Sequence, residues 1–133
     1  MTDLIQLIYS SQPFGFDTAM LNGILIIARR NNPRDGITGA LICRRDLYLQ
    51  LLEGPREAVE ARYRRIARDD RHLEVVQRVC RPVPERLFPT WAMRDDPARS
   101  WMWTAKDVDD GALDRATPED FIAVFARLAA EID

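Results

Sequence analysis

The stretch from Asp35 to Gly54 constrains the fold more than any other part of the sequence. Ile37–Cys43 and Leu47–Leu52 are both rich in strand-forming residues. The polar residues between them, Arg44-Arg45-Asp46, favour a short turn. We therefore predict a hairpin of two strands at this point of the chain.

A single polar residue, Gln50, interrupts the second strand of the hairpin. Strand side chains alternate between faces, so Tyr48, Gln50 and Leu52 share one face. A buried amide needs partners for two donors and an acceptor, and leaving one unpaired costs on the order of 1–3 kcal/mol. Two interpretations stay open for this residue alone: a core glutamine satisfied by a neighbouring side chain, which is the commoner case, or a glutamine that binds a polar ligand.

The rest of the first 94 residues alternates between strand and helix patterns. In the first strand, Ile5, Leu7 and Tyr9 share a face. In the second helix, apolar residues at helical spacing form a stripe of Val59, Tyr63, Ile66 and Ala67. The elements predicted outside the hairpin are strand Leu4–Ser10, helix Asp17–Asn31, helix Pro55–Arg68, strand Val75–Val83 and strand Phe88–Met93.

The order of these elements, β-α-β-β-α-β followed by a further strand, is the ferredoxin-like split βαβ plan. We predict an α+β fold with a mixed five-stranded sheet and two helices on one of its faces. We expect the plan to place the first and third strands side by side and parallel. Tyr9 and Gln50 would then be neighbours.

The residues after Met93 are expected to form a separate helical extension. A short helix is predicted from Thr104 to about Leu113, and Thr117-Pro118-Glu119-Asp120 is typical of a helix start. Terminal helices would cover the second face of the sheet, which two helices on the first face leave bare. The alternative is that the terminal helix mediates dimer formation or transmits a signal, instead of covering the sheet. The predicted regions are residues 1–94 and 95–133, and the apolar stripe of the last helix is Phe121, Phe125, Leu128 and Ile132.

Composition excludes several classes of function. The net charge of −2 over 133 residues argues against general nucleic-acid binding. Residues 1–94 carry 15 basic and 11 acidic groups, a net of +4, whereas residues 95–133 carry 4 and 10, a net of −6. The two halves either present solvated surfaces of opposite sign, or the acidic segment docks on the basic part or on a partner.

The sequence favours a cytoplasmic location without membrane contact. No run approaches the roughly 18 apolar residues of a membrane span, and the start lacks the basic region of a signal peptide. Cys43 and Cys80 are expected to be buried, reduced thiols. Because His72 is the only histidine, no metal site is expected.

Five motifs, taken together, resemble the BLUF (blue light using flavin) photoreceptor family. They occur in the order and spacing of that family over about residues 2–94, and they are specific jointly, because each one alone is an ordinary structural sequence. The motifs are LIYSS with Tyr9 and Ser11, ARRNNPRDGITGAL with Asn32, LYLQLLEGP with Gln50, RIARDDRH with Arg71 and His72, and RLFPTWAM with Trp91 and Met93.

The resemblance implies a non-covalently bound flavin between helices Asp17–Asn31 and Pro55–Arg68. FAD is the flavin that the family commonly uses, with FMN and riboflavin as alternatives. Ile24 and Ile66 would press on the faces of the ring, Asn32 would bind its pyrimidine edge, and Arg71 would reach O2. The implied cofactor-binding residues are Ser11, Ile24, Asn31, Asn32, Ile66, Arg71 and His72.

The resemblance also implies a photochemical relay. Tyr9 would give an electron and then a proton to the excited flavin, and Gln50 would bridge the ring and the Tyr9 hydroxyl. Rotation or tautomerisation of the amide would reverse the hydrogen-bond pattern, since its two ends are unlike. The signal would pass through Trp91 and Met93 to the terminal helices. Its output would be a downstream protein partner or a change in a homo-oligomer.

The expectation is thus a photosensory flavoprotein without an enzymatic output domain, for which 133 residues leave no room. The alternative is a ferredoxin-like binding or regulatory module without photochemistry. An acylphosphatase-type enzyme is disfavoured because the loop Ser11–Phe16 contains no basic residue. An RNA-binding sheet is disfavoured because the central strands lack exposed aromatic residues with a basic surround.

Overall fold

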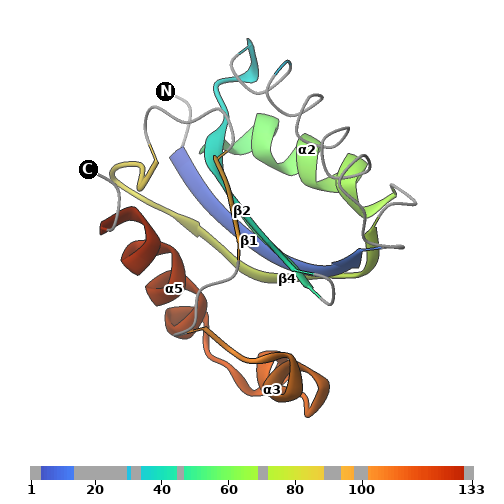
Figure 1. Cartoon of the computed structure of the whole chain (residues 1–133). Coiled ribbons are helices and arrows are strands. Elements are labelled where there is room, and N and C mark those ends of the chain that lie inside the picture. Colours follow the sequence, from blue (N-terminus) through green and yellow to red (C-terminus); the bar gives the residue numbers. More distant parts are fainter. Residues whose placement is uncertain are drawn as a thin grey trace.

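The computed structural model describes residues 4–13, 30, 34–44, 47–68, 72–88, 94–97 and 102–130, and for residues 13, 43, 72–74 and 94–97 it describes the backbone alone. Within these ranges the chain forms strands and helices in the order expected of an α+β fold (Figure 1). The strands are β1 (Leu4–Pro13), β2 (Thr38–Arg44), β3 (Leu47–Pro55), β4 (His72–Pro82) and β5 (Arg94–Pro97), and the helices are α2 (Arg56–Ala67), α3 (Ala105–Asp109), α4 (Ala112–Arg115) and α5 (Pro118–Ala130).

The described strands form one sheet in the order β4-β1-β3-β2-β5. Four of them, β4, β1, β3 and β2, are joined by antiparallel pairing, and β5 pairs with β2 in parallel. The prediction that β1 and β3 run parallel is wrong, although they are neighbours as expected. In a split βαβ unit the two parallel strands are separated by one position, and the hairpin strand between them, here β3, runs opposite to both.

The fifth strand does not begin at Phe88, as was predicted. Phe88 lies in a bend, and the described part of the strand pairs with β2 from Arg94 to Pro97. Residues 89–93 of the predicted strand, with Trp91 and Met93, lie outside the described residues. The physical reason is visible at Leu87 and Phe88. Their backbone N–H groups donate to the carboxylate of Glu53, at 2.9 Å each, and so do not enter a strand ladder.

The sheet separates two apolar cores, because alternate residues of each strand enter different layers. On one face Ile5, Leu7 and Tyr9 pack with Val59 of α2. On the other face Ile8 and the β3 residues Leu49 and Leu51 belong to a core completed by the C-terminal helices. Figure 1 shows α2 and α5 on opposite sides of the sheet. The prediction that C-terminal helices cover the second face is confirmed for the described residues. Their buried apolar residues are Met102, Leu113, Phe121, Val124, Phe125 and Leu128.

The helix boundaries follow their capping residues. Helix α5 begins at Pro118 as predicted, with Thr117 and Asp120 exchanging backbone-to-side-chain hydrogen bonds of 3.2 and 2.9 Å. The single helix predicted from Thr104 to Leu113 is instead two short helices, because Gly111 adopts a left-handed φ of 87° between them.

Two smaller predictions about burial are wrong. Ala67 was expected in the buried stripe of α2, but it is exposed because the helix ends there. Cys80 was expected to be buried, but it is an exposed free thiol on β4, which lies at the edge of the sheet.

Close backbone contact explains the glycines of the ITG and LEG motifs. A Cβ on Gly39 would lie 1.9 Å from the carbonyl oxygen of Leu51, and one on Gly54 would lie 2.7 Å from that of Gly36. A side chain at Gly39 would push β2 and β3 apart, and one at Gly54 would push β3 away from the segment before β2. None of the helices within the described ranges has the length and apolar character that a bilayer crossing requires.

Candidate functional site

Tyr9 and Gln50 form a buried polar pair at the centre of the sheet. They lie directly opposite each other in the register of β1 and β3, and their side chains are 0% and 4% exposed. The Tyr9 hydroxyl donates a hydrogen bond to Oε1 of Gln50. The predicted neighbourhood is confirmed, and Gln50 has a protein partner at its carbonyl end.

Aromatic and apolar side chains from α2 surround this pair. The Tyr63 ring lies 5.7 Å from that of Tyr9 at a tilt of 52°. Burial raises the pKa of the Tyr63 hydroxyl above its ordinary value. Ile66, one of the predicted flavin contacts, packs against the same apolar cluster as Tyr9. Ser11, another, is buried and faces Tyr48 across the ladder.

The remaining predicted contacts have no described side chain. His72 begins β4, where its backbone pairs with Pro13. The structure thus brings Tyr9 and Gln50 together, packs Ile66 against the cluster that contains Tyr9, and leaves the other predicted roles as predictions. Outside the described residues lie Ile24, Asn31, Asn32, Arg71, Trp91 and Met93.

The Tyr9–Gln50 bond can exist in two senses. In the observed sense the phenol donates and the amide carbonyl accepts. The terminal torsion of glutamine has a broad, roughly two-fold profile, so rotation by half a turn would present NH₂ in place of the carbonyl. A buried pair of this kind can therefore store two hydrogen-bond patterns without a change of charge.

Sequence reasoning missed a fully buried carboxylate, Glu53, at the end of β3. It accepts hydrogen bonds from Nε2 of Gln6 at 3.1 Å and from the backbone N–H groups of Leu87 and Phe88. Arg86 reinforces the same connection by donating to the Glu53 carbonyl at 3.1 Å and to that of Gly36 at 2.7 Å. The available signal was a charged residue at a core position of an otherwise apolar strand.

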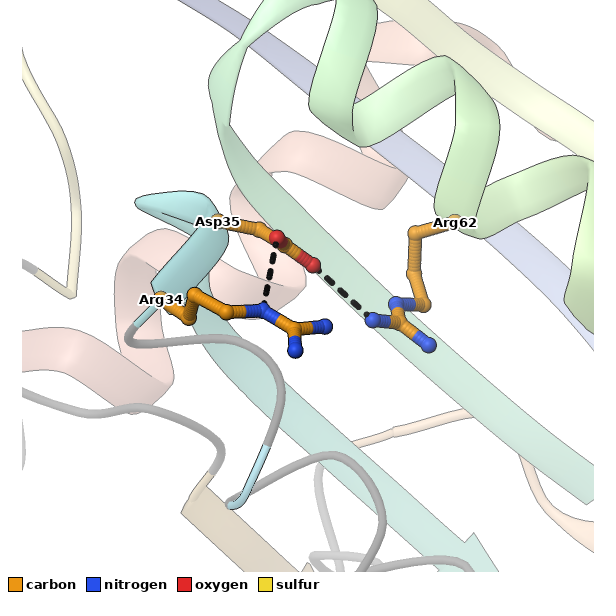
Figure 2. A network of polar contacts seen from close by, with 3 residues as sticks. All are labelled: Arg34, Asp35 and Arg62. Carbon is orange, nitrogen blue, oxygen red and sulfur yellow. Dashed lines mark hydrogen bonds and ion pairs between the residues drawn. The ribbon is translucent and has the colours of Figure 1, made fainter.

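Sequence reasoning also missed an ion-pair network beside α2, which Figure 2 shows. The carboxylate of Asp35 lies between two guanidinium groups, 3.5 Å from Nε of Arg34 and 3.1 Å from Nη2 of Arg62. No local motif marked these residues, because their proximity arises from the packing of α2 against the segment before β2.

The C-terminal helices are fastened to the sheet by arginines as well as by apolar packing. Arg78 of β4 donates to Ser10 at 2.9 Å and to Asp114 at 3.0 Å, and its guanidinium lies 5.7 Å from the centre of the Phe121 ring. Arg44 donates to the carbonyl oxygen of Trp103 at 2.8 Å. The acidic segment thus docks on the basic part of the chain, with a charged contact from β4.

An α+β sheet with a buried phenol–amide pair facing a helix is the arrangement of a flavin-based blue-light sensor domain. The family model described as "Sensors of blue-light using FAD", named BLUF, matches residues 4–94. The chain therefore belongs to the BLUF family. Members of this family sense blue light through a bound flavin, and this chain does so as well.

Individual relatives agree with this membership. The chain is 34% identical to the BLUF protein BlrB in its dark-state structure, with a TM-score of 0.82 and coverage of 99% of both chains. It is 42% identical over 62 residues to the blue light- and temperature-regulated antirepressor BluF of Escherichia coli, and 39% identical over 74 residues to the photoactivated adenylate cyclase subunit beta of Euglena gracilis. These matches span 47% and 55% of the chain but only 15% and 9% of those relatives.

Proposed function

We propose that Tyr9 and Gln50 carry out the photochemical step of this blue-light sensor. The observation that carries the proposal is the buried hydrogen bond from the Tyr9 hydroxyl to Oε1 of Gln50. A bound flavin supplies a strong oxidant when it is excited by blue light. With the flavin bound, Tyr9 would lose an electron to it and pass its hydroxyl proton to Oε1 of Gln50. Nε2 of Gln50 would release a proton toward the ring, which makes the change a tautomerisation of the amide. Return of an electron and a proton to Tyr9 would leave the amide tautomerised or rotated.

The described residues suit a flavin in both polarity and shape. The Tyr9–Gln50 pair offers an amide that can donate and accept at the polar edge of a ring. The partly buried Ile66 of α2 adds apolar surface on the same side of the sheet, which suits a face of the ring. We propose that Ser11, Ile24, Asn31, Asn32, Arg71 and His72 complete the site, and that FAD is the flavin it holds.

The signal would leave the site through the sheet toward the C-terminal helices. We propose that Trp91 and Met93 respond to Gln50, and that residues 95–133 form an extension that reads this change from residues 1–94. The pairing of β5 with β2 and the bond from Arg44 to Trp103 support such a route. The output is then a cytoplasmic protein partner or a change of homo-oligomeric state, with no enzymatic activity in this chain.

Relatives use comparable outputs. One is a light-regulated antirepressor, and another is a subunit of a light-activated adenylate cyclase. In the present chain the fully buried carboxylate of Glu53 connects β3 to the segment before β5.

The decisive experiment is a lit-minus-dark absorption spectrum of the purified, flavin-loaded protein. Blue light should shift the flavin band to the red, and the shift should decay in darkness. Tyr9→Phe and Gln50→Leu should abolish the shift while the flavin stays bound. Tyr63→Phe is the matched control, because it removes a neighbouring phenol and should leave the shift in place.

Two outcomes would contradict the proposal. A protein that takes up no flavin would be a binding or regulatory module without photochemistry. A normal photocycle in Tyr9→Phe or Gln50→Leu would show that the relay runs through other residues.

A further inference from the structure

A groove of about 490 Å³ lies between α5 and the segment formed by α3 and the residues just before it. Both apolar and charged side chains line this groove. An apolar centre bordered by charged groups is typical of a surface that contacts another protein. Trp103, Ala123 and Val124 contribute apolar lining, and Asp107, Asp120 and Arg127 contribute the charged groups.

Four of the lining residues form one stripe along α5. Asp120, Ala123, Val124 and Arg127 occupy positions i, i+3, i+4 and i+7 of the helix, so they share one face. Asp120, Ala123 and Arg127 are exposed, and the stripe is therefore accessible to a second protein. It carries a carboxylate at one end, a guanidinium at the other end, and small or apolar side chains between them.

This stripe is complementary to itself. A contact between two identical surfaces has a twofold axis, and each residue pair in it occurs twice. An axis midway between Ala123 and Val124 places Asp120 of each copy opposite Arg127 of the other, because both residues lie three and a half positions from that axis. The small side chain of Ala123 at the centre lets the two antiparallel helices approach closely. A parallel arrangement would instead bring like charges together.

Helix caps hold the two carboxylates of the groove in fixed positions. Oδ2 of Asp120 accepts from the backbone N–H of Thr117, and Oδ2 of Asp107 accepts from that of Thr104, at 2.9 Å each. The second oxygen of each carboxylate can still accept a charged hydrogen bond. A guanidinium has five donors, so Arg127 can bind a carboxylate of a second chain in addition to its contacts within its own chain. Because the carboxylates are already positioned, binding costs less conformational entropy.

We propose that this groove is the contact surface of a homodimer, in which the α5 helices of two copies pack antiparallel and Asp120 of each chain pairs with Arg127 of the other. A helix of 13 residues is about 20 Å long, so the contact is small and its Kd lies in the micromolar range. The inference rests on the proposed function, because it names the surface of the homo-oligomeric output. The contact itself needs no flavin.

Sedimentation velocity of the full, flavin-loaded chain over a concentration series measures this dimer. In darkness the wild-type protein should pass from the mass of one chain to that of two between about 1 and 100 μM. Asp120→Lys and Arg127→Glu should each weaken the dimer by about tenfold or more, because the twofold axis turns two attractive pairs into two repulsive pairs. Arg127→Glu keeps the experiment interpretable if Asp120→Lys disturbs the start of α5, where Asp120 caps the helix.

A mixture of the two variants is the decisive sample. In a dimer of one Asp120→Lys chain and one Arg127→Glu chain, the introduced lysine faces the introduced glutamate, and the remaining arginine faces the remaining aspartate. The mixture should therefore dimerise with a Kd close to that of the wild-type protein. Glu119→Lys on α5 and Arg64→Glu on α2, across the sheet (Figure 1), are matched controls. They make the same charge changes at exposed positions outside the groove and should leave the Kd unchanged.

Three outcomes would overturn this inference. A wild-type protein that stays monomeric at about 100 μM would leave a different protein as the occupant of the groove. A dimer that survives both substitutions would use another surface. A mixture that dimerises no more tightly than either variant alone would show that Asp120 and Arg127 do not face each other. A normal light-induced absorption shift in Tyr9→Phe would instead contradict the proposed function and leave the dimer unaffected.

Discussion

Replacement of Glu53 by glutamine tests whether a buried carboxylate holds the sheet to the connection that follows β4. Its Oε2 accepts from Nε2 of Gln6 at 3.1 Å and from the Leu87 N–H at 2.9 Å, and its Oε1 accepts from the Phe88 N–H at 2.9 Å. Glutamine can reproduce the bond at Oε1, but at the other position it presents two donors to two donors.

The expected cost follows from the two hydrogen bonds lost at Oε2. Hydrogen bonds to a charged acceptor contribute about 1.5–3 kcal/mol each, and a buried donor left unpaired carries a penalty of similar size. Gln6 has little freedom to turn its carbonyl toward the new amide, because that carbonyl already accepts from Arg81 at 3.2 Å. We expect Glu53→Gln to lower the free energy of unfolding by about 3 kcal/mol.

Urea denaturation followed by circular dichroism measures this loss as a fall in the midpoint concentration at unchanged slope. Glu85→Gln is the matched control, because it removes the same charge from an exposed position and should change stability by less than about 0.5 kcal/mol. If the two variants unfold at the same urea concentration, the reasoning about Glu53 is refuted.

Three further substitutions test other parts of the fold. Thr117→Ala removes one half of the reciprocal bonding with Asp120 and should cost about 1 kcal/mol in urea denaturation; no loss would mean that the cap is not stabilising. Burial raises the pKa of Tyr63 above 10.0, so the folded protein keeps a proton that the unfolded chain gives up, and the free energy of unfolding should decline as the pH rises past about 10. Tyr63→Phe should flatten that decline, and an identical alkaline profile would argue against this sign. Arg78→Gln should speed proteolytic cleavage around α4 with little change in global stability, because its partner Asp114 is largely exposed; equal cleavage rates would show that Arg78 does not fasten the helix.

Strand alternation predicted which residues within each strand share a face, namely Ile5, Leu7 and Tyr9 in β1 and Tyr48, Gln50 and Leu52 in β3, but not that these two sets lie on the same side of the sheet. The alternation of side chains between the two faces depends only on the backbone of a single strand, so the sequence pattern predicts it without knowledge of the neighbouring strands. Strand direction was predicted wrongly for β1 and β3, because alternation is the same in parallel and antiparallel sheets. The start of the fifth strand at Phe88 was predicted wrongly, because Glu53 accepts from the N–H groups of Leu87 and Phe88 and is 34 and 35 residues away from them in the sequence.

The candidate site was predictable to the extent that short motifs carry its chemistry. The pairing of Tyr9 with Gln50 followed from strand order and is confirmed. The contacts of Arg62 were not predictable, because an arginine on an amphipathic helix is normally solvated and nothing local brings Asp35 to it. Buried charges of this kind become visible only when the tertiary packing is known.

Strand β3 belongs to two structural layers at once, since Gln50 faces the photochemical side while its neighbours Leu49 and Leu51 are embedded under the C-terminal helices. Changes to this strand that are meant to alter the absorption colour or the recovery time would therefore also disturb the packing of the C-terminal helices, the region proposed to carry the output. Substitutions in helix α2 avoid this problem, because among the described residues α2 packs against the core that contains Tyr9 and not against the core under the C-terminal helices. An engineer who wants a slower or faster photoreceptor with unchanged signalling should begin there.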